Sequence, residues 1–171
     1  MNKSFIYVKH VSHMNLVSPK SSGHESINIY MIGNNPIELS TIYDKLKSIK
    51  TKTYHAEIGF DLKRAYKKIM QFNPACILID DNLEKDYLRN LLRKLSRGAR
   101  TRNIPITIIK NSNYSSAYLG DVQEFLLKDS ITSEGLSSSI SNSIRLRAMQ
   151  KYLYTKYKKK QSQFLSFFAN N

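Results

Sequence analysis

Short apolar runs alternate with amphipathic segments along most of the chain. Runs of strand length cover residues 27–32, 54–58, 76–79, 104–109 and 124–127. Between them, apolar residues recur three and four positions apart, as Leu39, Ile42 and Leu46 do. This spacing places apolar side chains on one face of a helix. The pattern therefore predicts strands and helices in alternation.

This alternation predicts the class of fold. Strands and helices that alternate at this spacing form right-handed βαβ units, in which a parallel sheet is covered by helices. The most continuous apolar run, Cys76 to Ile79, is typical of a central strand buried on both faces. We therefore expect an α/β fold with a five-stranded, parallel, doubly wound sheet of the flavodoxin-like type and helices on both faces. Ligands of such sheets bind at the carboxyl ends of the strands.

The chain divides into three parts by composition. Residues 1–25 are rich in Ser, His and Lys, and we expect a flexible N-terminal extension there. Residues 26–148 hold the alternating pattern. Residues 149–171 form a basic C-terminal helix or tail. The first helix of the domain has a marked start, with Asn35 as N-cap, Pro36 in the first turn and Glu38 at the position of a capping box.

Charge and cysteine content limit the classes of partner and compartment. Lys+Arg 27 against Asp+Glu 13 gives a formal net charge of +14, which favours an anionic partner or surface. The single cysteine, Cys76, excludes an internal disulfide. No apolar run reaches the roughly 20 residues of a membrane span, and no signal peptide is visible. We expect a cytoplasmic protein.

Three stretches of the chain resemble bacterial response-regulator receiver domains. Residues 73–83, Asn-Pro-Ala-Cys-Ile-Leu-Ile-Asp-Asp-Asn-Leu, are similar to the third strand of that family, with Asp80 at the phospho-accepting position. Residues 92–106 resemble its third helix and the approach to the fourth strand. Residues 124–128 resemble its fifth strand, with Phe125 at the aromatic switch position and Lys128 at the position of the family's lysine.

The resemblance spans about residues 27–148. It implies a CheY-like strand order and a role in two-component signal transduction or a phosphorelay. In the family, phosphoryl transfer to the aspartate uses Mg²⁺, which prefers carboxylate and other oxygen ligands.

The predicted phosphoacceptor pocket departs from the family. Gly33 and Asn34 stand where the family has an acidic pair, and Lys110 replaces a hydroxyl residue at the end of the fourth strand. One carboxylate, Asp80, would then face Lys128 and Lys110, which is unfavourable for a divalent cation. We expect no cofactor and no metal site, and an Asp80 that is inactive as a phosphoacceptor. Lys110 either pairs with Asp80 in place of the metal or points to solvent.

The C-terminal segment contains a second candidate site. Tyrosines are interleaved with basic residues there, and the candidate anion-binding residues are Lys151, Lys156, Lys158, Lys159 and Lys160. This segment could contact phosphates or an anionic surface, pair with a partner helix, or form a solvated linker. No catalytic triad, Gly-rich phosphate loop or cluster of metal ligands is visible, so catalytic residues are not assigned and an enzyme is not expected.

These features predict an atypical receiver, or pseudo-receiver, that acts through contact with a signalling protein and without Mg²⁺-dependent phosphorylation. Residues 111–121 are Ser- and Asn-rich, which predicts a short or irregular fourth helix. A homodimer would then form through a non-standard face. Two alternatives remain open. One is a regulator that binds nucleic acid through the basic C-terminal helix, and the other is a response regulator that is still phosphorylated.

Overall fold

The computed structural model describes residues 26–111 and 124–169. Its strands are β1 (Ser26–Ile32), β2 (Thr53–Gly59), β3 (Cys76–Asp80), β4 (Ile106–Lys110) and β5 (Glu124–Leu127). Its helices are α1 (Pro36–Ser48), α2 (Leu62–Phe72), α3 (Lys85–Arg97), the short 3₁₀ helix η1 (Lys128–Ser130) and α4 (Ser133–Ala169). The expected N-terminal extension and the expected short helix between β4 and β5 lie outside the described residues.

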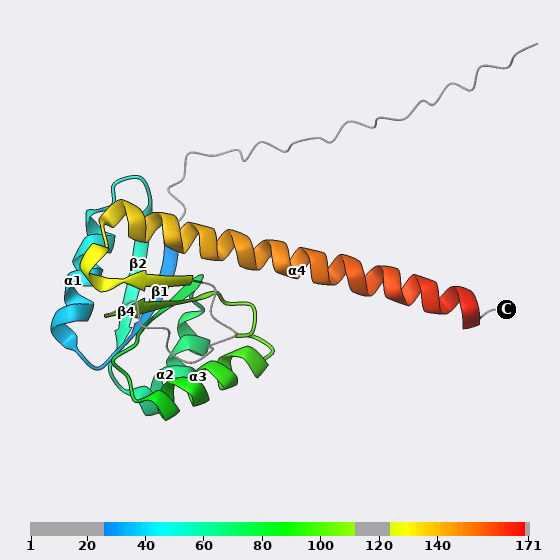
Figure 1. The fold of residues 1–171 in the computed structure, drawn as a ribbon, viewed down its shortest axis with the longest axis horizontal. Helices are drawn as coiled ribbons and strands as arrows, with labels where there is room; N and C mark the ends of the chain where they lie inside the picture. The colour runs from blue at the N-terminus through cyan, green and yellow to red at the C-terminus, as the bar shows by residue number, and fades with distance from the viewer. Residues whose placement is uncertain (1–25, 112–123, 170–171) are drawn as a thin grey trace, which may run out of the picture.

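The five strands form one parallel sheet in the order β2-β1-β3-β4-β5 (Figure 1). The predicted α/β class and the doubly wound arrangement are therefore confirmed. The strand order reverses between β1 and β3, which is the point where sheets of this topology open a crevice at their carboxyl edge. The register pairs Ile32 with Ile79, and Asp80 with Ile109, so that β1, β3 and β4 end close together.

Two helical layers cover the sheet, as Figure 1 shows. Side chains alternate between the faces of a strand, and the buried residues follow this rule. Tyr30 and Ile77 face α2 and α3, whereas Met31 and Leu78 face α1 and α4. All five residues of β3 are buried, as expected for a central strand.

The helix α1 begins directly after β1 because its start is capped locally. The Asn35 side-chain oxygen accepts hydrogen bonds from the backbone N–H groups of Ile37 and Glu38, and Pro36 occupies the first turn. This confirms the predicted N-cap. The tight connection places the first turn of α1, including Glu38, at the carboxyl edge of the sheet.

The helix α4 has two distinct halves. Leu136 and Ile140 near its start are fully buried against the sheet, and the Tyr54 hydroxyl bonds to that of Ser137 at 2.8 Å. From residue 148 to 167 every side chain is exposed, and the helix extends away from the domain (Figure 1). It continues without a break through the predicted boundary at residue 148. Within the described residues, no helix is both long and apolar enough to span a bilayer.

These two halves predict unequal contributions to stability. Ile140→Ala should lower the free energy of unfolding by about 2–5 kcal/mol, because it leaves a cavity between α4 and the sheet. Met149→Ala, on the exposed half of the same helix, should change it by less than about 0.5 kcal/mol. Chemical denaturation of both variants measures the difference. Equal losses would contradict the division of α4 into a packed and an exposed half.

Candidate functional site

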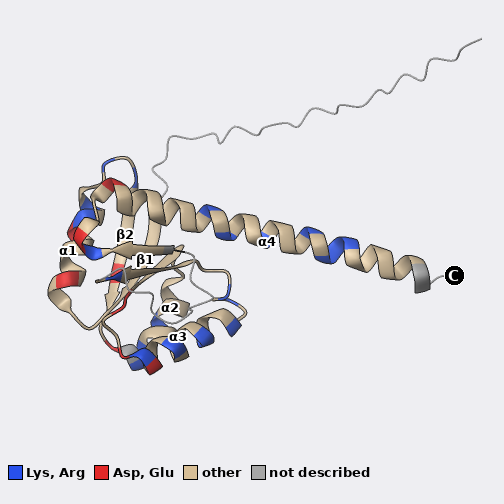
Figure 2. Ribbon diagram, in the orientation of Figure 1, with Lys and Arg blue, Asp and Glu red and all other residues tan. Residues whose placement is uncertain are grey.

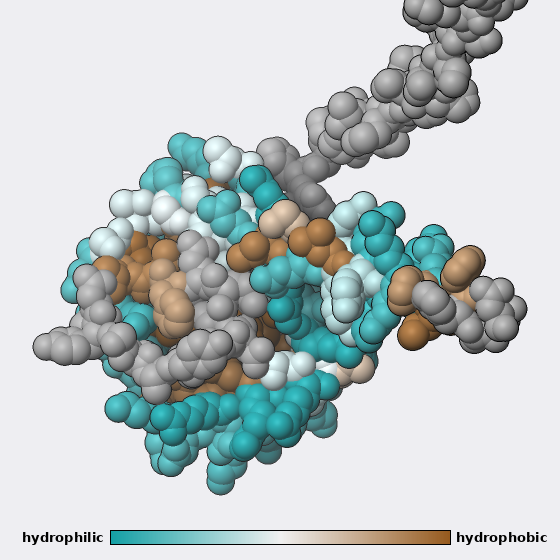
Figure 3. All heavy atoms as spheres, turned by 45° about the vertical axis from the view of Figure 1, so that its right-hand side comes forward, coloured by the Kyte–Doolittle hydropathy of each residue, from teal (hydrophilic) through white to brown (hydrophobic). Residues whose placement is uncertain are grey.

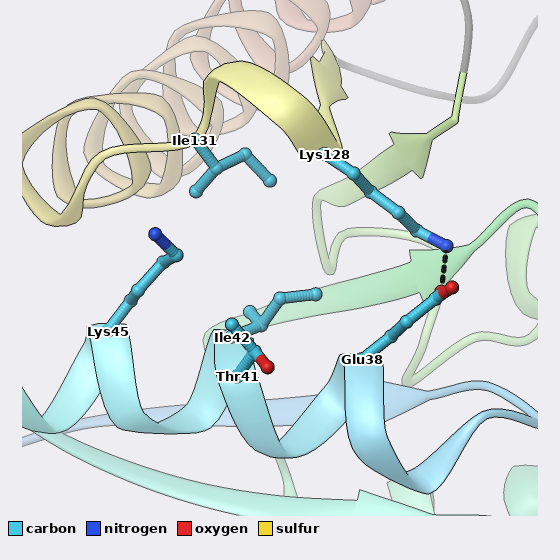
Figure 4. Close-up of a pocket in the computed structure, with 6 residues that line it drawn as sticks. All are labelled: Glu38, Thr41, Ile42, Lys45, Lys128 and Ile131. Carbon is cyan, nitrogen blue, oxygen red and sulfur yellow. Dashed lines mark hydrogen bonds and ion pairs between the residues drawn. The ribbon is translucent and has the colours of Figure 1, made fainter.

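An ion-pair cluster lies at the carboxyl edge of the sheet. Asp80, the last residue of β3, is 0% exposed, and the Lys128 side chain, directly after β5, is 11% exposed. The Lys128 Nζ lies 2.7 Å from Oδ1 of Asp80 and also donates to Oε2 of Glu38. Figure 4 shows the second contact, at one end of a small pocket of about 120 Å³ between α1 and η1. One ammonium group therefore bridges two carboxylates.

The topology explains how these three residues meet. Glu38 comes from the first turn of α1, Asp80 from the end of β3 and Lys128 from the start of η1. The strand β4 lies between β3 and β5, so a short side chain at position 128 would not reach Asp80. The lysine stem supplies the required length and packs its methylene groups in the partly apolar surroundings.

The protonation of the cluster follows from these contacts. Hydrogen bonding to the Lys128 ammonium lowers the pKa of Glu38, although burial acts in the opposite direction. Burial by itself would lower the pKa of Lys128, but its hydrogen bonds to Asp80 and Glu38 outweigh burial and raise that pKa. Lys128 is thus held as a cation, and Glu38 as an anion, over a wider pH range than usual.

Three asparagines complete the surroundings of the cluster. The Asn82 backbone N–H donates to Oδ1 of Asp80 at 3.0 Å, and its side-chain amide donates to Oε2 of Glu38 at 3.3 Å. Asn111 donates to the Asn82 side-chain oxygen at 2.5 Å, and Asn34 donates to the Asn82 carbonyl at 3.0 Å. These bonds orient the loop after β3 around the carboxylates.

The residues of this edge do not fit a resident divalent cation. An added Cβ at Gly33 would lie 2.9 Å from Cβ of Asp80 and 2.9 Å from Cδ1 of Leu39, so the position is too crowded for an acidic side chain. Asn34 donates its amide N–H to the Asn82 carbonyl, and its side-chain oxygen offers a neutral ligand in place of a carboxylate. Lys128 lies between the two carboxylates, and the described residues contain no group of three or more His, Cys, Asp or Glu side chains that could hold a metal ion.

The two predicted lysines of the pocket have different surroundings. Lys128 pairs with Asp80, whereas the Lys110 Nζ lies 5.0 Å from the ring centroid of Phe125 on the neighbouring strand β5. This is a cation–π geometry between adjacent strands. The ammonium group at Asp80 is therefore supplied by Lys128. Lys110, for which pairing with Asp80 and exposure to solvent were both open, contacts the Phe125 ring.

The sequence interpretation missed Glu38 as a pocket residue. It assigned Glu38 to a capping box and left the pocket with one carboxylate, which is wrong, because the Glu38 carboxylate faces Lys128 and Asn82. A usable signal was present: the predicted N-cap at Asn35 starts α1 directly after β1, so first-turn residues lie at the carboxyl edge. Asp81, next to Asp80, is half-buried, and burial raises the pKa of its carboxyl group.

The predicted anion-binding lysines lie apart from this cluster. They are on the exposed half of α4, where Figure 2 shows basic bands along the helix. The structure does not bring Lys151, Lys156, Lys158, Lys159 or Lys160 to the carboxyl edge. The chain thus has two separate candidate sites.

Comparison with known proteins finds no matching family model and no matching curated protein. Solved structures do match. A sensor protein from a Polaromonas species has a TM-score of 0.59 and 20% identity, over 71% of this chain and 98% of its own. A response regulator from Desulfuromonas acetoxidans has a TM-score of 0.57 and 16% identity, over 70% and 98%.

A third match is the receiver domain of a sensor histidine kinase from Pseudomonas aeruginosa, with a TM-score of 0.58 and 18% identity over 70% of this chain and 98% of that domain. That structure has a magnesium ion coordinated in its active-site cleft. The chain has the CheY-like receiver fold. Its cluster of Asp80, Lys128 and Glu38 therefore lies at the carboxyl edge of a receiver fold.

The ion pair predicts a specific pattern of stability losses. Lys128→Met should lower the free energy of unfolding by about 3–5 kcal/mol, because it leaves the buried Asp80 carboxylate without its cation. The double variant Asp80→Asn with Lys128→Met should be more stable than Lys128→Met alone, since the uncompensated charge is gone. Chemical denaturation gives both values. A double variant that is less stable than Lys128→Met would show that the unpaired Asp80 carboxylate is not the cause of the loss.

The lowered pKa of Glu38 predicts a pH dependence. A carboxyl group whose folded-state pKa is lowered adds stability above its unfolded pKa and loses it as the pH falls through the folded value. Between about pH 5 and 3, the wild-type protein should therefore lose more stability than Glu38→Gln. Thermal unfolding across this range measures the difference. Parallel curves for the two proteins would show that Glu38 does not titrate against Lys128.

Proposed function

We propose that the protein is a pseudo-receiver: a signalling module that acts through contact with a protein partner and without Mg²⁺-dependent phosphorylation of Asp80. The observation that carries the proposal is that Lys128 pairs with both Asp80 and Glu38, while Gly33 and Asn34 supply no carboxylate for a metal ion. Receivers named among the solved structures belong to two-component signalling, which supports a signalling role.

The geometry supports a pocket in which Asp80 is not phosphorylated. Asp80 is fully buried: its Oδ1 accepts hydrogen bonds from Lys128 and the Asn82 backbone, and its Oδ2 has no hydrogen-bond partner among the described residues. Phosphoryl transfer to a carboxylate requires access to the donor and cations that neutralise the transferred charge. At this edge the cation is a tethered lysine that supplies one positive charge, and the acidic first-strand pair is absent at Gly33 and Asn34.

The three-residue cluster also has a consequence for signalling. Lys128 is bound at once to Asp80 at the end of β3 and to Glu38 in the first turn of α1. The loops after β3 and β5 are therefore held together constitutively. We infer that the partner recognises this one arrangement, and that regulation comes from the partner or from the amount of protein.

Magnesium titration tests the proposal. The wild-type protein should show no rise in melting temperature in millimolar Mg²⁺, while Lys128→Ala should gain a rise of a few degrees, because Asp80 and Glu38 become available as ligands. Lys45→Ala is the matched control, since Lys45 lines the same pocket and should leave the Mg²⁺ response unchanged.

The same samples are then incubated with acetyl phosphate and Mg²⁺ and weighed by intact mass spectrometry. The wild-type protein should remain unmodified at Asp80. A Mg²⁺-stabilised wild type that gains one phosphoryl group on Asp80 would contradict the pseudo-receiver and support the phosphorylated alternative.

A further inference from the structure

The exposed half of α4 has an apolar stripe along one side. Leu146, Met149, Leu153 and Tyr157 are spaced by three or four residues, and Phe164 continues this spacing one heptad later. All five are exposed. Figure 3 shows hydrophobic spheres among hydrophilic ones towards the free end of this helix. A stripe of large apolar side chains in water marks an interaction surface.

The stripe is on a different face from the one that packs on the domain. Leu136, Ile140 and Arg147 define the packed face, since Leu136 and Ile140 are buried and Arg147 donates to the backbone carbonyl of Arg102. At about 100° per residue, the line through Leu146 and Leu153 is rotated from that face by roughly a quarter turn. The sheet therefore does not cover the stripe, and the stripe is not a continuation of the domain core.

The charge of this segment is one-sided. Residues 145–169 contain two arginines and five lysines and have no Asp or Glu. The lysines lie beside aromatic rings: the Lys156 Nζ is 5.3 Å from the Tyr152 ring centroid, and the Lys158 Nζ is 5.9 Å from that of Tyr154. Whatever covers the stripe has to be apolar and anionic at once.

A second copy of this helix does not meet that requirement. Pairing two copies would bring two segments of the same positive charge together, with no acidic residue to balance them. Lys160 also falls within the stripe, between Leu153 and Phe164, where a coiled-coil seam would bury it, whereas at a bilayer interface its long side chain can extend to the headgroups. Duplex nucleic acid would match the charge but would leave the apolar stripe in water.

An anionic lipid surface meets both requirements. Amphipathic helices that lie in the bilayer interface bury an apolar face among acyl chains, while lysines at its borders extend to anionic headgroups. Tyr157, in the stripe, is of a residue type favoured at the headgroup level. We propose that α4 from Leu146 to Phe167 docks in the plane of an anionic phospholipid bilayer and holds the receiver-fold domain at that surface. The docked segment is about 33 Å long, which is ample for interfacial binding.

Neighbouring residues provide a matched pair of variants. Leu153 in the stripe is 58% exposed, and Tyr152 outside the stripe is 59% exposed. The full chain is sedimented with vesicles of phosphatidylcholine that contain about one phosphatidylglycerol in four lipids. Leu153→Ser should weaken vesicle binding about tenfold, because the leucine side chain is lost from the acyl region. Tyr152→Ser should change binding less than twofold.

The contribution of the lysines to vesicle binding is tested separately. The double variant Lys158→Gln with Lys159→Gln should weaken binding about tenfold at low salt, and vesicles of phosphatidylcholine alone should bind far more weakly than the anionic ones. Equal losses for Leu153→Ser and Tyr152→Ser would overturn the docking face. So would binding to duplex DNA without binding to vesicles, or a dimer in light scattering that Leu153→Ser dissociates.

Discussion

The buried charge of Asp80 is the constraint on which the carboxyl edge of this sheet depends. An ionised carboxylate without exposure to water is costly unless a cation and hydrogen-bond donors compensate it. Lys128 supplies the cation, and the Asn82 backbone supplies a donor. The fold meets this requirement by closing the ends of β3 and β5 and the first turn of α1 around a single ammonium group.

The proposed pseudo-receiver role rests on the same cluster. A conventional pocket concentrates negative charge and therefore needs an exchangeable cation. Here the crowding at Gly33 excludes an acidic side chain, and Glu38 places its carboxylate against a lysine instead. In the proposed pseudo-receiver, this arrangement of the loops would not depend on metal ions or phosphate.

The helix α4 connects the domain core to the exposed apolar stripe. Its first turns complete the core through Leu136 and Ile140, and its later turns carry a stripe of different orientation. One unbroken helix joins the two, so the direction of the stripe relative to the sheet follows from helix geometry alone. Docking of the stripe on a surface would therefore also set the orientation of the sheet.

Much of this architecture was predictable from local patterns. The apolar runs of β1 and β3, the cap at Asn35 and the helical spacing of α1 depend on residues close together in the sequence, so the element order and the class of fold followed from them. The position of Asp80 and Lys128 at strand ends was predictable for the same reason. The role of Glu38 was not predictable, because the local sequence is the same whether this glutamate caps the helix or faces the pocket.

Periodicity and charge are properties of neighbouring residues, so the local sequence predicts the strands and helices and shows that the C-terminal helix is basic and amphipathic. The contact of Lys128 with Glu38, 90 residues away, and the contact of Lys110 with the Phe125 ring arise only in the folded chain. Such contacts depend on the order of strands in the sheet and on the reach of each side chain. Neither is contained in the local pattern of apolar and polar residues.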